Sequence, residues 1–166
     1  MKSFRLIALS LLILTLHFEG FSQENIKTIF LVRHAEKADD GTSNPSLDEK
    51  GVMRAETLAK MLSSAEVTHI YSTNYKRTLE TGQPLAKALG IEISTYDPRD
   101  PLAIQKISEE SGTTTILVIG HSNTIPTMVN QLIGVDKYEQ LGENDYDNLF
   151  TVTVAGDNKD CFILKY

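Results

Sequence analysis

Short runs of β-branched and apolar residues alternate along the chain with longer segments in which apolar residues recur every three or four positions. The short runs are typical of buried strands, and we expect them at residues 28–32, 67–71, 91–96 and 114–119. The helical periodicity is carried by Val52, Ala55, Leu58, Ala59 and Leu62, by Leu79, Leu85, Ala86 and Leu89, and by Ile125, Met128, Val129 and Leu132. Because strand and helix alternate, we predict one three-layer α/β domain with a mainly parallel sheet and helices on both faces.

Glycines and a second kind of pattern mark where these elements end. Gly90 follows the second helical set and Gly134 follows the third, and glycine commonly ends a helix. Residues 150–154 and 161–165 are strand-like and flank the turn sequence at 156–158. This arrangement predicts a terminal hairpin at one edge of the sheet.

The first 22 residues have the pattern of a secretory signal peptide rather than of a folded element. Lys2 and Arg5 precede an apolar run over residues 6–16, which is shorter than the roughly 20 apolar residues that span a bilayer. We therefore expect signal cleavage and an exported domain over residues 23–166, either periplasmic or secreted. A signal that is kept as a membrane anchor is the alternative.

Composition and charge restrict the class of partner. The chain has 166 residues, which suits a single domain. Its formal net charge of −6 argues against binding to nucleic acid, which requires clustered cations. Its single cysteine, Cys161, can form no internal disulfide, and we interpret it as a buried strand residue. An anionic substrate would then need a local positive site to gather it.

Two histidines follow directly on strands that we expect to be parallel. Arg33 and His34 come after the first strand, and His121 and Ser122 come after the fourth. Since ligands of open α/β sheets bind beyond the carboxyl ends of the strands, we expect both histidines at the same edge. Arg77 lies in the first turn of the helix after the second strand, where a helix N-terminus favours a bound anion.

Three motifs surround these residues in order: Leu-Val-Arg33-His34-Ala-Glu36, Ser72-Thr-Asn-Tyr-Lys-Arg77-Thr-Leu-Glu-Thr81 and Val-Ile-Gly-His121-Ser. Together they resemble the histidine phosphatase superfamily and its phosphoglycerate-mutase-like fold, especially its small members. The resemblance covers residues 26–134 by motif. It implies that His34 is the nucleophile that carries the phosphoryl group. It further implies that Arg33, Arg77 and a protonated His121 bind the phosphoryl oxygens.

The chemistry is consistent with these roles. A neutral imidazole nitrogen can attack phosphorus and split one displacement into two easier ones, and guanidinium groups donate paired hydrogen bonds to phosphate oxygens. With such fixed cations we expect neither a metal nor a cofactor. The mature chain has His34, His69 and His121 without ligand spacing on a helix, which argues against zinc. Ser122 is expected either to bind phosphate or to cap the helix that follows.

The resemblance also implies an acid that protonates the leaving group. Asp97 is the candidate by position, and Asp100 and Glu36 are alternatives. Asp97 before a proline also fits an ordinary turn residue. Some phosphohistidine-directed relatives lack this acid, because a phosphoramidate leaving group is easier to expel.

The sequence predicts a metal-independent phosphatase that acts through a phosphohistidine intermediate on a phosphomonoester or a phosphohistidine. A phosphoglycerate-mutase-type phosphotransferase is one alternative, against which the short chain and the expected export weigh. A non-catalytic phosphate-binding module is another, against which the four intact cationic and imidazole residues weigh. The expected partner is a small phosphorylated substrate, without nucleic acid and without a membrane after signal cleavage. We assign specificity to the loops at residues 39–45 and 98–105. The sequence indicates no oligomeric state.

Overall fold

A six-stranded sheet lies between two layers of helices in the computed structural model, which describes residues 26–109 and 114–166. The expected signal peptide, residues 1–22, falls outside this part of the chain. Among the residues that the structure describes, no helix has the length and apolar character needed to cross a membrane.

The strands are arranged in the order β3-β2-β4-β1-β5-β6. The first four strands of this order run parallel to one another, whereas β5 pairs antiparallel with β1. β5 and β6 also pair antiparallel and form the predicted terminal hairpin. The prediction of a mainly parallel sheet is therefore confirmed. The elements in chain order are β1 (Ile26–Arg33), α1 (Glu49–Leu62), β2 (His69–Thr73), α2 (Lys76–Leu89), β3 (Ile93–Tyr96), α3 (Ala103–Ser108), β4 (Thr114–Gly120), α4 (Thr124–Ile133), β5 (Asn148–Ala155) and β6 (Asn158–Lys165).

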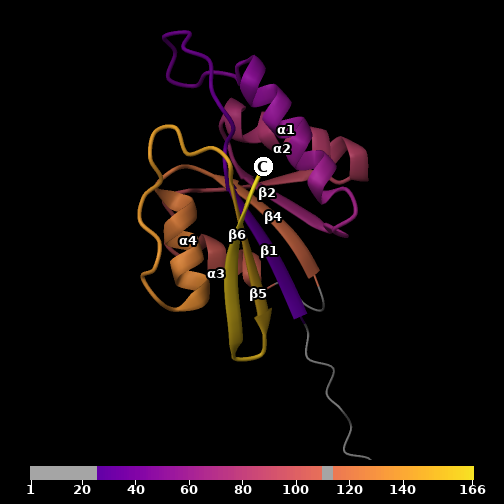
Figure 1. The fold of residues 1–166 in the computed structure, drawn as a ribbon, viewed down its shortest axis with the longest axis vertical. Coiled ribbons are helices and arrows are strands. Elements are labelled where there is room, and N and C mark those ends of the chain that lie inside the picture. The colour runs from indigo at the N-terminus through magenta and orange to yellow at the C-terminus, as the bar shows by residue number, and fades with distance from the viewer. Residues whose placement is uncertain (1–25, 110–113) are drawn as a thin grey trace, which may run out of the picture.

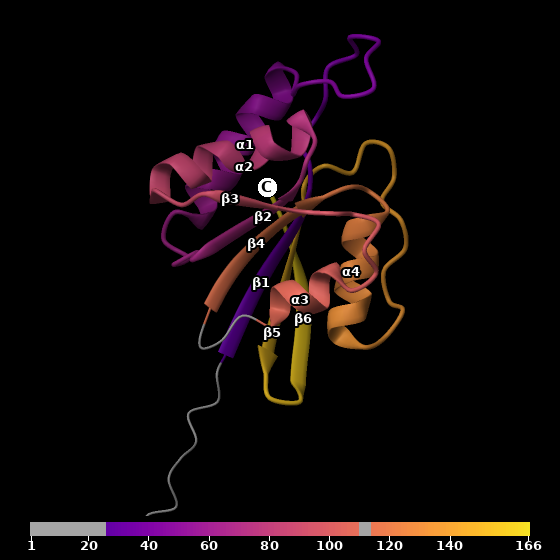
Figure 2. The ribbon, with the colours of Figure 1, turned by 180° about the vertical axis from the view of Figure 1, so that it is seen from behind.

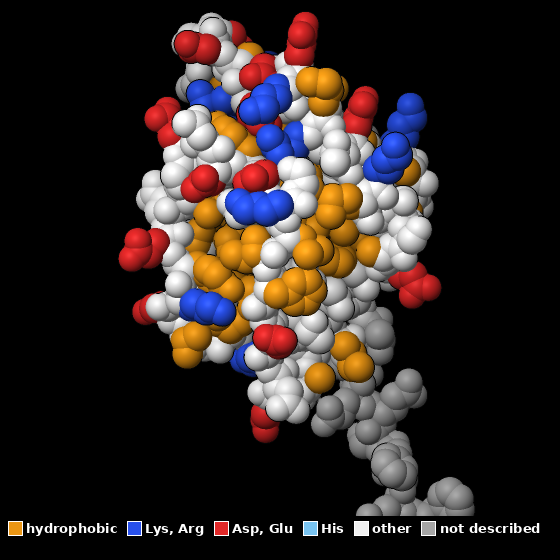
Figure 3. Space-filling model, viewed as in Figure 1, with side chains coloured by type: hydrophobic (Ala, Val, Ile, Leu, Met, Phe, Trp, Pro, Cys, Tyr) orange, Lys and Arg blue, Asp and Glu red, His pale blue; other side chains and the backbone are white. Residues whose placement is uncertain are grey.

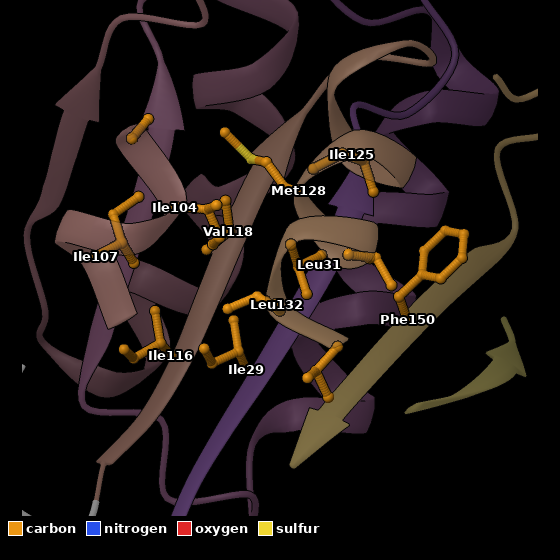
Figure 4. Close-up of a cluster of buried hydrophobic side chains, with 13 residues drawn as sticks. Ile29, Leu31, Ile104, Ile107, Ile116, Val118, Ile125, Met128, Leu132 and Phe150 are labelled. Carbon is orange, nitrogen blue, oxygen red and sulfur yellow. The ribbon is translucent and has the colours of Figure 1, made fainter. Parts of the chain in front are cut away.

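Helices cover both faces of the sheet, as predicted. Figures 1 and 2 show α1 and α2 on one face and α3 and α4 on the other. Figure 4 shows how the second pair packs: Ile29 and Leu31 of β1 meet Ile125, Met128 and Leu132 of α4. Burying an aliphatic side chain of this size contributes about 1.5–3 kcal/mol, so the sheet and its helices hold the strand ends in fixed places. Gly90 and Gly134 end their helices in the left-handed conformation, also as predicted.

Helix α1 contacts the rest of the protein through a stripe that begins one residue earlier than expected. Val52 is 47% exposed, whereas Gly51 is buried and its N–H donates to the Asp48 side chain at 2.7 Å. A Cβ at position 51 would lie only 2.1 Å from the backbone oxygen of Glu36. Only a glycine therefore lets the start of α1 approach the loop after β1.

The second strand runs over residues 69–73 rather than 67–71. The sequence pattern ended it early because Ser72 and Thr73 are polar, yet both are fully buried. Their hydroxyl groups are satisfied locally: that of Ser72 donates to the Thr73 carbonyl and that of Thr73 to the Thr78 hydroxyl. The buried strand therefore carries polar residues to the edge where the site forms.

Two further expectations change in detail. The loop expected over residues 98–105 contains the start of α3, whose Ile104 and Ile107 pack into the core. Six residues are too few to show helical periodicity. Cys161 lies in a strand, as predicted, but it is half-buried rather than buried, with its sulfur 3.5 Å from the Tyr138 hydroxyl.

The edge strand β6 presents apolar side chains to the outside. Phe162, Ile163 and Leu164 are each between 39% and 49% exposed. Figure 3 shows apolar side chains gathered in the middle of the face that contains the hairpin, with charged side chains scattered around them. None of these three residues lines the site described next.

Candidate active site

The parallel pairing of β1 with β4 brings His34 and His121 together. In the register of these strands Arg33 stands opposite Gly120, and the His34 backbone N–H donates to the Gly120 carbonyl at 2.9 Å. The two histidines therefore follow the same rung of the ladder, and their ring centroids lie 5.5 Å apart. The sequence placed both residues at one edge, and the structure brings their side chains into contact.

Hydrogen bonding fixes the tautomer of the buried His34 ring. Its Nδ1 lies 2.8 Å from the Ala35 carbonyl oxygen. Because a carbonyl oxygen only accepts, Nδ1 must carry the proton, and Nε2 of the neutral ring then holds a lone pair. This is the form that can act as a nucleophile.

The surroundings of His34 also favour its neutral form. Burial is the main cause that lowers its pKa from 6.5 to about 3, and the charges of Arg77, His121 and Arg33 add to the effect. The bond to the Ala35 carbonyl acts in the opposite direction but does not prevail. The nucleophile that the chemistry requires is therefore neutral at physiological pH.

A chain of hydroxyl groups orients His121. The Thr78 hydroxyl donates to the Thr73 carbonyl at 2.8 Å, so it must accept from the Thr73 hydroxyl, 3.0 Å away. The Thr73 hydroxyl then accepts from Nε2 of His121, also at 3.0 Å. With its proton on Nε2, neutral His121 gains any further proton at Nδ1.

The charge state of His121 differs from the expectation. Burial, together with the charges of Arg77 and Arg33, lowers its pKa to about 4. The protein's own groups therefore favour a neutral His121, whereas the resemblance implied a protonated one. A bound phosphate would act against the two guanidinium groups and raise this pKa.

Arg33 is buried and held by the loop between α4 and β5. Its Nη1 donates to the carbonyls of Gly142 and Glu143 at 2.8 and 3.0 Å, and its guanidinium carbon lies 3.9 Å above the Tyr146 ring. Its Nε is buried and has no hydrogen-bond partner among the described residues. A buried N–H donor without a partner is costly unless a ligand satisfies it.

Arg77 lies in the first turn of α2, as expected, and shares this feature. Its guanidinium carbon is 4.6 Å from the Tyr75 ring centroid, and its buried Nε also lacks a partner within the described part of the chain. The helix N-terminus itself is partly used, because the Lys76 N–H donates to the Asn44 side chain at 2.9 Å. Both arginines line the same cavity as the histidines, and each has one buried Nε donor without a partner among the described residues.

These four residues line one cavity of about 450 Å³, a size typical of small-molecule sites. The remaining lining residues are Lys37, Tyr75, Pro98, Arg99, Ser122, Asn123 and Thr124. Ser122 lies here as expected, and no side chain caps α4 at Asn123, so helix capping does not account for this segment. A hollow of about 590 Å³ elsewhere, beside α3 and the hairpin, contains neither histidine.

None of the three candidate acids lines this cavity. Asp97 instead forms a two-point ion pair with Arg99, which lowers the pKa of its carboxyl. A group held ionised in this way is a poor proton donor. The structure therefore does not bring Asp97 to the reacting groups.

The two alternatives are occupied in the same way. Glu36 is buried against α1, where a bidentate bond from Arg54 and a contact with Lys50 lower its carboxyl pKa to about 2. Asp100 binds Lys106 at 2.6 Å, and this contact lowers its pKa as well. Both carboxylates act as structural anchors of their loops.

The described residues contain no group of three His, Cys, Asp or Glu side chains arranged to hold a metal ion. His69, the third histidine of the described chain, lies at the start of β2 and bonds to Thr68. The positive charge of the cavity comes instead from its lysine and arginine side chains.

Sequence reasoning missed several residues of the cavity. Lys37 lies in a loop without periodicity, so no pattern marked it, whereas Tyr75 and Arg99 lay within the second motif and the expected specificity loop without being assigned a role. The carbonyls that bind Arg33 belong to residues more than 100 positions later in the chain. Nothing in the sequence of that polar loop predicts the contact.

Comparison with known proteins shows similarity to one family. The family model for branch 1 of the histidine phosphatase superfamily matches residues 29–100. A probable phosphoglycerate mutase, GpmB, of Proteus mirabilis is 35% identical over 77 residues, which make up 43% of this chain and 35% of that protein. The chain thus spans about a third of the length of the curated relatives it matches.

Two solved structures share the fold. The phosphoglycerate mutase of Bacillus anthracis superposes with a TM-score of 0.68 at 16% identity, over 85% of this chain and 93% of that one. The protein histidine phosphatase SixA in complex with tungstate gives a TM-score of 0.66 at 17% identity, over 83% and 96%. At such identities these two structures establish the fold alone.

We predict that His34 is neutral, with its proton on Nδ1, between about pH 5 and pH 8. Its folded-state pKa of about 3 lies below the ordinary value of 6.5, so this buried neutral ring contributes stability above pH 6.5 that is lost as the pH falls toward 3. Nitrogen NMR of the imidazoles, assigned with His34→Ala, measures both the tautomer and the pKa. A His34 ring that gains its second proton near pH 6.5 contradicts the assignment.

We predict that Arg77→Lys lowers kcat/KM for a phosphorylated substrate by about a hundredfold, because lysine keeps the charge but loses the planar pair of donors. Lys76→Arg is the matched control, since it changes an exposed cation one residue away that lies outside the cavity. Steady-state kinetics decide the matter. Near-normal turnover of Arg77→Lys would show that the Arg77 guanidinium does not bind the phosphoryl group.

Proposed function

We propose that this chain, which belongs to branch 1 of the histidine phosphatase superfamily, is a metal-independent phosphatase that transfers the phosphoryl group of its substrate to His34 and then to water. One observation carries the proposal. A neutral His34 with a free Nε2 stands beside the buried Arg33 and the partly buried Arg77, whose Nε donors have no partner among the described residues.

In the first step Nε2 of His34 attacks phosphorus, and the bond from phosphorus to the leaving group breaks. Nδ1 keeps its proton and donates a hydrogen bond to the Ala35 carbonyl, which stabilises the positive charge that develops on the ring. Arg33 and Arg77 bind the non-bridging oxygens, where the negative charge of a loose transition state is spread. In the second step a water attacks phosphorus and the bond from phosphorus to Nε2 breaks. The water transfers one proton to a phosphoryl oxygen, so the products are inorganic phosphate and neutral His34.

His121 changes its proton content during this cycle. Phosphoryl oxygens near its ring would raise its pKa and draw a proton to Nδ1, since Nε2 already donates to Thr73. The protonated ring can then donate to a phosphoryl oxygen. His121 is then neutral in the free protein, where the protein's own groups lower its pKa, and cationic when a phosphoryl group is bound.

The cavity favours substrates whose leaving group needs no proton donor. Among its lining residues there is no carboxylic acid, and the three candidate acids are paired elsewhere. A phosphoramidate, such as phosphohistidine, and an aryl phosphate both satisfy this condition, whereas an alkyl phosphate does not. The shared fold with a protein histidine phosphatase supports the first of these classes.

Export to the periplasm or medium rests on the sequence of residues 1–22 alone. A phosphoglycerate mutase remains the competing reaction because relatives with that name match part of the chain. A mutase would return the phosphoryl group to an isomerised phosphoglycerate rather than release it as phosphate.

We predict that the protein releases phosphate from an aryl phosphate in the presence of EDTA, and that His34→Ala lowers kcat/KM by about a thousandfold or more. His69→Ala is the matched control, because it removes a half-buried histidine outside the cavity. A phosphoramidate should be hydrolysed with a higher kcat/KM than an alkyl phosphate. Phosphate release is followed for wild type and the two variants with each of the three substrates.

The outcomes separate the alternatives. Loss of wild-type activity in EDTA that a divalent metal restores would overturn metal independence. Isomerised phosphoglycerate without free phosphate would establish the mutase, and binding of phosphate without turnover of any substrate would establish a binding module. Equal rates with His34→Ala and wild type would remove His34 from the reaction.

A further inference from the structure

The cavity carries more positive charge than a phosphoryl group requires. Four of its lining residues, Arg33, Lys37, Arg77 and Arg99, are cationic and none is acidic, although the whole chain has a formal net charge of −6. Arg33 and Arg77 flank the histidines and account for the phosphoryl group itself. Lys37 and Arg99 are left without a role in that chemistry.

These two cations line the cavity from different loops, and both are exposed. Lys37 follows His34 by three residues and makes no ion pair within the described residues, whereas Arg99 belongs to the loop between β3 and α3. Arg99 is 88% exposed and shares its charge with Asp97. Both side chains therefore remain accessible to a second negative group.

The space beyond the phosphoryl site extends past Arg99. A neighbouring hollow of about 510 Å³ shares Tyr75, Pro98 and Arg99 with the catalytic cavity. The Tyr75 ring, which lines both spaces, lies nearly perpendicular to the His121 ring, with ring centroids 5.2 Å apart. A leaving group that extends there from the catalytic cavity, which Lys37 lines, would contact Arg99 beside the Asp97 carboxylate with which Arg99 is paired.

We infer that Lys37 and Arg99 form a second anion subsite, and that the substrate is a phosphorylated compound whose leaving group carries a further anionic group such as a carboxylate. This inference rests on the proposed function, because it assigns the direction in which the leaving group lies. The second anion is neutralised by two exposed cations, one of which is shared with Asp97. Specificity in this protein therefore lies in the loops that follow β1 and β3.

The test compares 3- and 4-carboxyphenyl phosphate with their neutral carboxamides, which have the same shape around phosphorus. For wild type we expect that the carboxyphenyl phosphate isomer that binds more tightly has a KM about two- to fivefold lower than that of its carboxamide, which is the effect of an exposed charge pair. This difference in KM should become smaller as the salt concentration rises. Lys37→Met should bring this ratio close to one. Lys60→Met, which removes an exposed lysine of α1, should keep the wild-type ratio.

A second variant gives a change of opposite sign. Asp97→Asn removes the partner of Arg99 and should increase the preference for the acid, because the Arg99 charge is then free for the substrate. If wild type has the same KM for acid and amide in both the 3- and the 4-substituted pair, the inference is overturned. Turnover of the amides would in that case still support the proposed function. An equal loss of preference in Lys37→Met and Lys60→Met would also overturn the inference.

If wild type hydrolyses neither acid nor amide, the proposed function fails, and the subsite is then tested by binding. Calorimetry with the same four probes should show tighter binding of the acids, and this difference should vanish in Lys37→Met. Equal affinities for acid and amide would overturn the subsite independently of catalysis.

Discussion

The site depends on the last rung of the ladder between β1 and β4, where the His34 N–H donates to the Gly120 carbonyl. Because side chains alternate between the faces of a strand, a slip of one residue in this register would turn His34 and Arg33 to the opposite face from their partners. A Cβ at Gly120 would lie 2.8 Å from the Tyr96 hydroxyl and 2.9 Å from side-chain atoms of Thr124 and Ile125, so these side chains would have to move to admit it. The same residue thus fixes the strand register and leaves room for the turn that presents His121.

Burial and positive charge act on the site in two ways at once. They keep His34 unprotonated, as a nucleophile must be, and they leave two arginine Nε donors without partners among the described residues. A phosphoryl group bound between the two guanidinium groups would offset their positive charge and raise the pKa of His121.

The sequence predicted the layers of the fold, the terminal hairpin and the approach of His34, Arg33, Arg77 and His121, because strand periodicity and the rule for strand ends are local or topological properties. It did not predict the state of the acids, since their partners depend on tertiary contacts. Glu36 is paired by Arg54 of α1, and the Asp97 carboxylate turns to Arg99 rather than to the cavity. The sequence pattern also ended β2 too early, because Thr73 is a polar residue that is nevertheless buried, where its hydroxyl bonds to His121.

The most direct test is to identify the residue that carries the phosphoryl group during turnover. The protein is mixed with a phosphoramidate, quenched in base within the first turnovers, digested, and analysed by mass spectrometry and phosphorus NMR. We predict one phosphorylated peptide, with phosphate on Nε2 of His34, and its absence from His34→Ala. Phosphate on any other residue, or turnover without a phosphorylated peptide, would contradict the assignment of His34 as the phosphoryl carrier.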